Sequence, residues 1–407
     1  MMKKFAVFII ILCVAALLGF AGMPASASAA TTASGKTSPT KNQAPFYYGV
    51  WLPYWQSVNG AQDVAQNLTT LDEVSPFSYE IGTGGMLIDD LGIGQGNWIP
   101  WFSAVRELGI KIIPTIAWFD GNGIYNMLSN TKTRQAEENK IAALVKSQGF
   151  DGIDIDFESM TEGTRPYYSL FIEGLAQRLH PQKKILTCTV EARTPPVDLY
   201  QTIPDSIIYP ENYTVLNQNC DEVRIMAYDQ DTINLTLDNE KGNGQLYAPV
   251  VDPAWVSQVL SMTLPYINPK KVMLGVPTYG YEYEVSWANG ITDYSRVRAF
   301  DYLDAMDRAD SLGITPTRNN ADELSFTYTS STYIQVSPIL DTTVFSASQP
   351  AILSGPNSST STTFFVSFPD SQSIADEIAL AKKAGLRGVM LFKADGDIDP
   401  LTWQYMN

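Results

Sequence analysis

Short apolar runs that recur along the chain, with helix-like segments between them, form the clearest pattern in this sequence. Eight such runs have the length of a strand and are rich in β-branched and aromatic residues. They cover residues 46–55, 73–81, 111–119, 150–158, 184–192, 222–229, 271–281 and 388–393. Eight strands that alternate with helices predict an α/β fold, specifically a (β/α)8 TIM barrel.

The spacing between the seventh and eighth runs breaks this pattern. About 100 residues separate Tyr281 from Gly388, whereas a barrel connection needs far fewer. We therefore predict a small α+β insertion between strands 7 and 8, at approximately 284–370. Within it we expect a helix over 297–312, short strands over 326–329 and 363–367, and a loop over 354–362.

The first 45 residues differ from the rest of the chain. Lys3 and Lys4 precede an apolar stretch, and the small residues of 25–29 offer A-x-A cleavage sites. This pattern predicts a signal peptide over 1–29, a Ser/Thr/Pro linker over 30–45 and the barrel over 46–407. No later apolar run reaches the roughly 20 residues of a spanning helix. We expect a secreted or cell-wall-associated protein whose mature chain has no membrane partner.

Charge and histidine content narrow the partners and the chemistry. The formal net charge is −16, and it becomes −18 without Lys3 and Lys4. This balance opposes binding to nucleic acid and favours a neutral glycan. The sequence has one histidine, His180, so histidine-rich zinc sites are excluded. We expect chemistry carried by carboxylates and tyrosines, with no metal or cofactor, in a monomer.

Two cysteines, Cys188 and Cys220, remain once the leader is removed. They could pair in an oxidising compartment, but a chain of this length does not need a disulfide to fold. Both states stay open at this point.

The run 151–158 carries the strongest chemical signal. Asp154, Asp156 and Glu158 alternate with apolar residues. On a strand they would share one face, about 6.5 Å apart. Like charges in a confined site raise at least one pKa, and a carboxylic acid that keeps its proton near neutral pH can act as a general acid. The alternatives are a solvated strand face and a calcium site.

The pattern Asp151-x-x-Asp154-x-Asp156-x-Glu158 resembles the DxxDxDxE signature of the family 18 glycoside hydrolases, the chitinase-like enzymes. Residues 224–229 (RIMAYD) are similar to the family's sixth-strand motif M-x-Y-D. Residues 274–280 (LGVPTYG) match its seventh-strand motif G-V-P-x-Y-G. Residues 76–79 and 149–152 resemble the branch of bacterial spore-germination and cell-wall-associated members. The resemblance covers 46–282 and 372–400, and it implies the same barrel fold.

The resemblance also implies a reaction. The protein would be a glycosidase of the chitinase or endo-β-N-acetylglucosaminidase type that cleaves β-linked N-acetylglucosamine glycans, either chitin oligomers or peptidoglycan, with retained configuration. Glu158 would be the general acid. The substrate's 2-acetamido carbonyl would attack the anomeric carbon, because family 18 is an exception to the two-carboxylate scheme. Asp156 would hold the amide, Tyr228 would bond its oxygen, and Asp154 would share a proton with Asp156.

Aromatic residues near the predicted strand ends are candidates for sugar binding, since flat pyranose faces pack on rings. Core packing is the alternative for each of them. The expected substrate-binding residues are Trp51, Trp118, Met226, Asp229, Tyr279, Phe392 and Glu191. Phe392 stands where the family usually has a tryptophan.

Strand parity adds one further hypothesis. Arg224 would share a face with Tyr228, and a guanidinium inside the barrel beside Asp154 would help neutralise the acidic run.

The rival function is a non-catalytic chitinase-like carbohydrate-binding protein. Such proteins usually lack the terminal glutamate of the signature, and Glu158 is present here.

Overall fold

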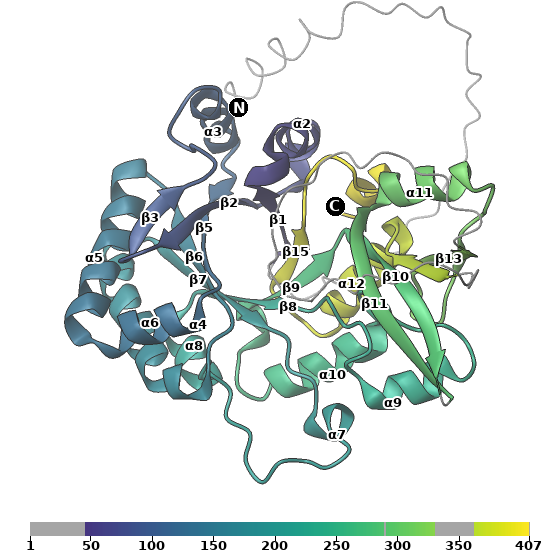
Figure 1. Cartoon of the computed structure of the whole chain (residues 1–407). Coiled ribbons are helices and arrows are strands. Elements are labelled where there is room, and N and C mark those ends of the chain that lie inside the picture. The colour runs from purple at the N-terminus through teal and green to yellow at the C-terminus, as the bar shows by residue number, and fades with distance from the viewer. Residues whose placement is uncertain (1–44, 289, 330–361, 407) are drawn as a thin grey trace, which may run out of the picture. The chain divides into compact units, whose positions relative to one another are not determined.

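Eight parallel strands close into a barrel in the computed structural model, which describes residues 45–288, 290–329 and 362–406 (Figure 1). Around the ring the strands are β1 (Tyr47–Pro53), β2 (Glu73–Gly82), β5 (Thr115–Trp118), β6 (Gly152–Phe157), β7 (Ile185–Glu191), β8 (Glu222–Met226), β9 (Val272–Pro277) and β15 (Gly388–Phe392). β15 pairs with β1 and closes the ring. The predicted TIM barrel is confirmed.

Helices cover the outside of this barrel (Figure 1). They are α2 (Ser57–Asn67), α3 (Trp98–Glu107), α4 (Gly121–Ser129), α5 (Thr131–Gln148), α6 (Arg165–Leu179), α7 (Pro196–Leu199), α8 (Tyr213–Asn219), α9 (Leu235–Leu237), α10 (Pro253–Thr263) and α12 (Ser371–Lys383). Two short strands, β3 (Met86–Asp89) and β4 (Lys111–Ile112), pair with β2. No described helix combines the length and apolar character that crossing a bilayer requires.

The helix before the acidic strand has well-defined ends. The Asn130 side chain accepts hydrogen bonds from the first backbone N–H groups of α5, and Gly149 ends the helix with a φ of +68°. A glycine adopts this left-handed conformation without steric cost. The chain then enters β6, where Ile153, Ile155 and Phe157 belong to the core between barrel and helices. Alternation therefore turns the acidic residues of β6 into the barrel interior.

An antiparallel sheet lies between β9 and β15 in the sequence, which confirms the predicted insertion. Its strand order is β11 (Ile291–Asp301), β10 (Tyr279–Ala288), β14 (Thr363–Phe368), β13 (Leu324–Thr329) and β12 (Thr317–Arg318). Helix α11 (Tyr302–Ser311) packs on this sheet around Phe300, Phe326 and Phe368. The strands expected over 326–329 and 363–367 are thus confirmed.

Two boundaries in this region differ from the sequence-based expectation. The run 271–281 is divided, because β9 ends at Pro277 and Tyr279 already begins β10 of the insertion sheet. The helix expected over 297–312 is wrong over its first turn, since residues 297–301 belong to β11, the strand that pairs with β10. Side chains on both faces of β11 are largely exposed, so the strand has no alternating polarity. The loop expected over 354–362 lies outside the described residues, apart from residue 362.

The leader and nearly all of the linker predicted for residues 1–45 also lie outside the described residues.

Cys188 of β7 and Cys220, two residues before β8, form a disulfide bond. Both side chains are fully buried. Of the two states that the sequence left open, the structure has the paired one.

This disulfide should stabilise the fold. The two cysteines are 32 residues apart in the sequence, and closing a loop of that length restricts the unfolded chain, which corresponds to about 3.7 kcal/mol. We expect the variant with both Cys188→Ala and Cys220→Ala to lose about that much free energy of unfolding, measured by urea denaturation of the oxidised proteins. Equal unfolding midpoints for the variant and the oxidised wild type would show that the bond contributes nothing.

Candidate active site

Three carboxyl groups follow one face of β6 from the barrel interior to its mouth. Asp154 and Asp156 are buried, and Glu158 is partly buried. The backbone N–H of Glu158 donates to the carbonyl of Trp118 at 2.9 Å, so the course of the strand continues one residue past β6. The carboxyl ends of the strands are where active sites of this fold lie.

Donors surround Asp154, the deepest of the three. Thr187 and Thr189 each donate to its Oδ1 at 2.9 Å, and Thr115 donates to its Oδ2 at 2.9 Å. Arg224 of β8 forms an ion pair with the same Oδ2, with Nη1 at 3.1 Å. The hypothesis of a lumenal guanidinium beside Asp154 is therefore confirmed.

Asp156 has a different environment. Burial raises the pKa of Asp156 well above its usual value, and the negative charges of Glu158 and Asp154 raise it further. Its Oδ1 is buried and has no hydrogen-bond partner among the described residues. Its surroundings therefore favour the protonated form of Asp156, and one of its oxygens is available for a hydrogen bond.

Glu158 has the pKa that a general acid needs at neutral pH. Burial raises its pKa to about 7, and the negative charges of Glu191 and Asp229 contribute. Glu191 ends β7, and its carboxylate accepts a hydrogen bond from the backbone of Ser159. The predicted residue Glu191 thus lies at the mouth close to Glu158.

An aromatic cluster forms another part of the barrel mouth. The rings of Tyr228 and Phe392 stack with centroids 5.4 Å apart and an interplanar angle of 14°. Tyr279 packs edge-on against both, at 6.2 and 6.0 Å. Met226 is partly buried against this cluster. Burial raises the pKa of Tyr228, so its hydroxyl remains a hydrogen-bond donor.

Asp229 ties the insertion to the barrel. Its Oδ1 accepts hydrogen bonds from the hydroxyls of Tyr279 and Tyr281 at 2.6 and 2.7 Å. Asp229 has a φ of +60°, a left-handed conformation that aspartate tolerates better than most residues. Strand β10 therefore contributes directly to the site.

The two predicted tryptophans differ in their positions. Trp51 is 2% exposed and packs inside the barrel, where its Nε1 donates to Asp154 Oδ2 at 3.4 Å. Its ring meets Phe392 edge-on at 5.8 Å. Ala117 belongs to a cluster of apolar side chains inside the barrel, and its neighbour Trp118 points to the opposite side of the strand. The Trp118 ring packs against Phe157, which belongs to the core between the barrel and the helices. The structure therefore separates the Trp118 ring from the carboxyl groups.

Sequence reasoning missed several polar residues in the barrel interior, among them Thr115 and Ser75. Thr115 donates to Asp154, and the hydroxyl of Ser75 accepts a hydrogen bond from Arg224 Nη1 at 2.7 Å. Ala117 and Phe77 belong to the apolar cluster inside the barrel. Residues two apart on a strand point to the same side, so strand alternation could have placed Thr115 and Ser75 in the interior as well. No cluster of three or more His, Cys, Asp or Glu side chains suited to a metal occurs among the described residues.

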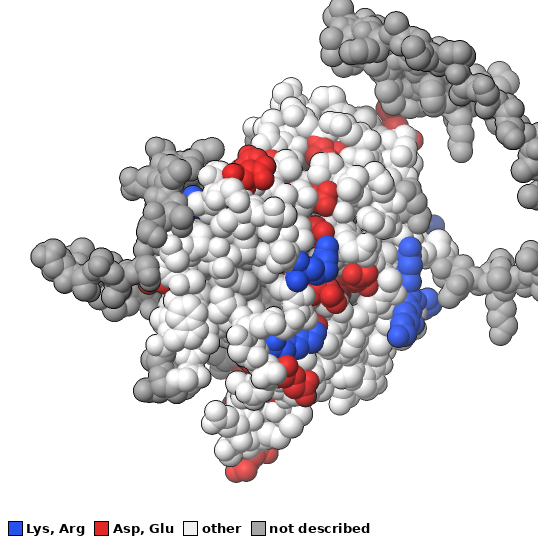
Figure 2. Space-filling view, turned by 90° about the vertical axis from the view of Figure 1, so that its right-hand side faces the viewer, with Lys and Arg blue, Asp and Glu red and all other residues white. Residues whose placement is uncertain are grey.

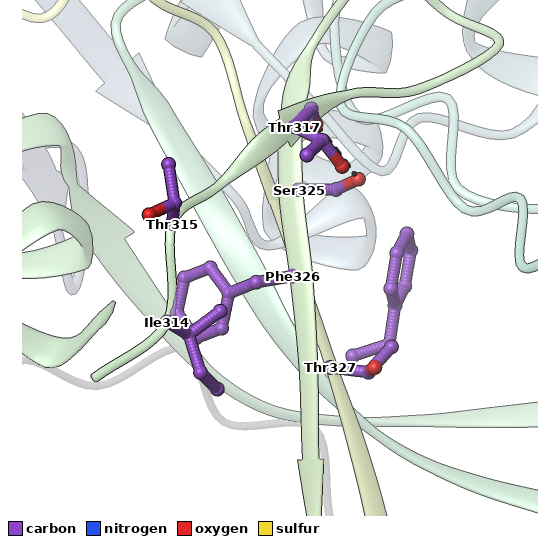
Figure 3. Close-up of a pocket in the computed structure, with 7 residues that line it drawn as sticks. Ile314, Thr315, Thr317, Ser325, Phe326 and Thr327 are labelled. Atoms are coloured by element: carbon purple, nitrogen blue, oxygen red, sulfur yellow. Dashed lines mark hydrogen bonds between the residues drawn. The ribbon is translucent and has the colours of Figure 1, made fainter. Parts of the chain in front are cut away.

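A surface hollow among the described residues of the insertion has no carboxyl group in its lining. This open hollow of about 270 Å³ on the insertion sheet is lined by Ile314, Thr315, Thr317, Ser325, Phe326, Thr327 and Phe365 (Figure 3). None of these side chains titrates near neutral pH. On the face in Figure 2, acidic and basic side chains lie next to one another near the centre, with further acidic side chains above them and a basic group at the right edge. The carboxyl column of β6 is therefore the better candidate site.

Comparison with known proteins agrees with this geometry. The model of the family "Glycosyl hydrolases family 18" matches residues 102–397. The Bacillus subtilis protein named "Putative sporulation-specific glycosylase YdhD" is 25% identical over 219 residues, or 53% of this chain and 48% of that protein. The chain thus spans about half the length of the curated relative it matches.

Two solved structures share the fold. The spore cortex-lytic enzyme SleL of Bacillus megaterium aligns with a TM-score of 0.65 and 18% identity, over 90% of this chain and 75% of that one. A chitinase of Chromobacterium violaceum aligns with a TM-score of 0.64 and 18% identity, over 89% of this chain and 98% of that one. Since the family model spans most of the barrel and its signature carboxyls line the interior, this chain belongs to family 18 of the glycosyl hydrolases.

Proposed function

We propose that this protein is an exported glycosidase that cleaves β-linked N-acetylglucosamine glycans, either chitin oligomers or peptidoglycan, with retained configuration. The observation that carries this proposal is the pair formed by Glu158, with a pKa of about 7, and the buried acid Asp156 beneath it. In this proposal Glu158 protonates the glycosidic oxygen and later takes a proton from water.

The nucleophile comes from the substrate. A two-carboxylate mechanism needs a second acid across the sugar from the first. Asp156 lies on the same strand and face as Glu158, about 6.5 Å along it. Asp229 is occupied by two tyrosine hydroxyls, and Glu191 lies close to Glu158. The carbonyl of the 2-acetamido group therefore attacks the anomeric carbon.

Two residues hold that acetamido group. The unpartnered oxygen of Asp156 accepts the amide N–H, and the Tyr228 hydroxyl donates to the carbonyl oxygen. Phe392, stacked on Tyr228, forms the apolar floor under the sugar. Met226, Asp229 and Tyr279 surround the same position. Because a phenyl ring is smaller than an indole, this floor covers less of a pyranose face.

Export is supported by the buried disulfide between Cys188 and Cys220, since such bonds persist in oxidising compartments. The leader-like pattern at the N-terminus agrees with this. The similar proteins include a sporulation-specific glycosylase, a spore cortex-lytic enzyme and a chitinase by their names. Both chitin and peptidoglycan therefore belong in the activity test.

The first test is turnover. We expect the wild type to release reducing ends from chitin oligomers or purified sacculi. Glu158→Gln should lower kcat on the order of 10²–10⁴-fold, because the proton donor is lost. Glu162→Gln is the matched control, as Glu162 is exposed four residues further on, and it should retain full activity. Binding of oligomers without turnover by the wild type would instead indicate a carbohydrate-binding protein.

The second test is the pH profile. Activity should fall as pH rises through about 7, because Glu158 then loses its proton. Glu191→Gln removes a negative charge that raises the pKa of Glu158, so this basic limb should move to lower pH. The exposed Glu107 offers a control variant, Glu107→Gln, with no expected shift. A basic limb that stays in place in Glu191→Gln contradicts this assignment.

The third test concerns the acetamido group. Aryl glycosides of chitobiose and cellobiose differ in the 2-acetamido and 2-hydroxyl groups. If the acetamido carbonyl is the nucleophile, initial rates should be measurable for the chitobioside and absent for the cellobioside. Comparable rates for both would mean that a protein side chain supplies the nucleophile.

A further inference from the structure

The end of β15 carries the ring proposed as the floor of the site and, next to it, a mostly buried lysine. Phe392 is the last residue of β15, and Lys393 follows it with 14% of its side chain exposed. The ammonium group of Lys393 forms ion pairs with Asp301 Oδ1, at 2.8 Å, and with Asp395. A charge taken out of water is costly unless it is paired, so these contacts determine where the Lys393 side chain points.

The main chain around Phe392 is held by the residue that follows β9. The backbone N–H of Thr278 donates to the carbonyl of Phe392 at 2.9 Å. The Thr278 hydroxyl accepts a hydrogen bond from the backbone N–H of Lys393 and donates to the carbonyl of Lys393, both at 2.7 Å. The side chain of Lys393 then joins this fixed stretch of main chain to the insertion, through Asp301.

Asp301 lies opposite a ring of the aromatic cluster. It is the last residue of β11, and the strand register pairs it directly with Tyr279 at the start of β10. Tyr279 packs edge-on against Phe392, with centroids 6.0 Å apart. The ion pair of Lys393 therefore links the residue next to one ring with the residue opposite the other. This short series of contacts restrains the distance between the two rings.

Negative charge surrounds Lys393 on both sides of this bridge. Asp395 and Asp397 follow β15, whereas Asp301 and Asp304 belong to the insertion, and the charges of Asp304 and Asp397 interact with that of Asp301. Burial lowers the pKa of Lys393, but the charges of Asp301 and Asp395 outweigh burial and raise it above its usual value. Without this cation, carboxylates of the barrel and of the insertion would repel one another.

We propose that Lys393 is a positioning residue: by bridging to Asp301 it holds the insertion against the end of β15 and sets the position of the Phe392 ring in the site. This inference rests on the proposed glycosidase function, in which that ring is the floor under the sugar, and deepens it. Lys393 acts through Phe392 and Tyr279 and not by contact with the sugar.

A double-mutant cycle tests whether the bridge acts through the floor. The measurement is kcat/KM on chitin oligomers or sacculi for Asp301→Asn, Phe392→Ala and the variant with both changes. We expect Asp301→Asn alone to lower kcat/KM on the order of 10–10²-fold, because small misplacements of a positioned group have effects of this size. In the Phe392→Ala background it should cause no further loss. Equal losses in both backgrounds would overturn the proposal.

Further variants separate the bridge from a general effect of charge. Asp304→Asn removes the same charge from an exposed neighbour in the first turn of α11, and it should leave kcat/KM unchanged. Lys393→Met should show the loss of Asp301→Asn, whereas Lys393→Arg keeps the cation and should lose less. Equal losses in Asp304→Asn and Asp301→Asn, or in Lys393→Arg and Lys393→Met, would overturn the proposal.

Aromatic-carbon NMR of the free protein with labelled phenylalanine tests the geometry without substrate. The stacked Tyr228 ring and the edge-on Tyr279 ring shift the Phe392 signals, which are assigned by their loss in Phe392→Leu. We expect these signals to move in Asp301→Asn, while those of Phe171 in the outer core stay in place. Unmoved Phe392 signals would overturn the proposal. Because this readout needs no turnover, it separates failure of this proposal from failure of the glycosidase function.

Discussion

The structure of this site depends on one buried ion pair, between Arg224 of β8 and Asp154 of β6. Three carboxyl groups on one strand face cannot all ionise in a confined interior. The guanidinium forms an ion pair with the deepest of them, and burial raises the pKa of the other two. Strand register makes this possible, because Asp156, Thr189 and Arg224 are paired in turn across β6, β7 and β8. The barrel thereby places the Arg224 cation beside the buried end of the acidic run.

The remaining parts of the mouth have separate tasks. The acids follow the course of strand β6. Another part of the site is an aromatic wall formed by Tyr228 after the end of β8, Phe392 of β15 and Tyr279 of β10. The insertion is part of this wall, since two tyrosines of β10 bind Asp229. Tyr228 lies close enough to Asp156 and Glu158 for their charges to contribute to its raised pKa, so the acidic and aromatic groups belong to one site.

Strand periodicity accounts for much of what the sequence could predict. Alternation placed Asp154, Asp156 and Glu158 on one face, and Arg224 on the face of Tyr228. Other features depend on tertiary contacts. The pKa of Glu158 reflects Glu191 and Asp229, which come from other strands. Trp118 sits at a strand end as expected, but its parity turns it toward the outer core. Residues 297–299 of β11 are all exposed, so they show no strand alternation and their place in β11 could not be read from the pattern.

The proposed function depends most on Glu158 as the proton donor, whose pKa burial and the charges of Glu191 and Asp229 raise to about 7. Neutron diffraction from deuterated crystals of the free protein, grown well below pH 7, would locate the proton of this carboxyl group directly. We predict deuterium on a carboxyl oxygen of Glu158. A bare carboxylate at Glu158 under these conditions would contradict its role as the proton donor.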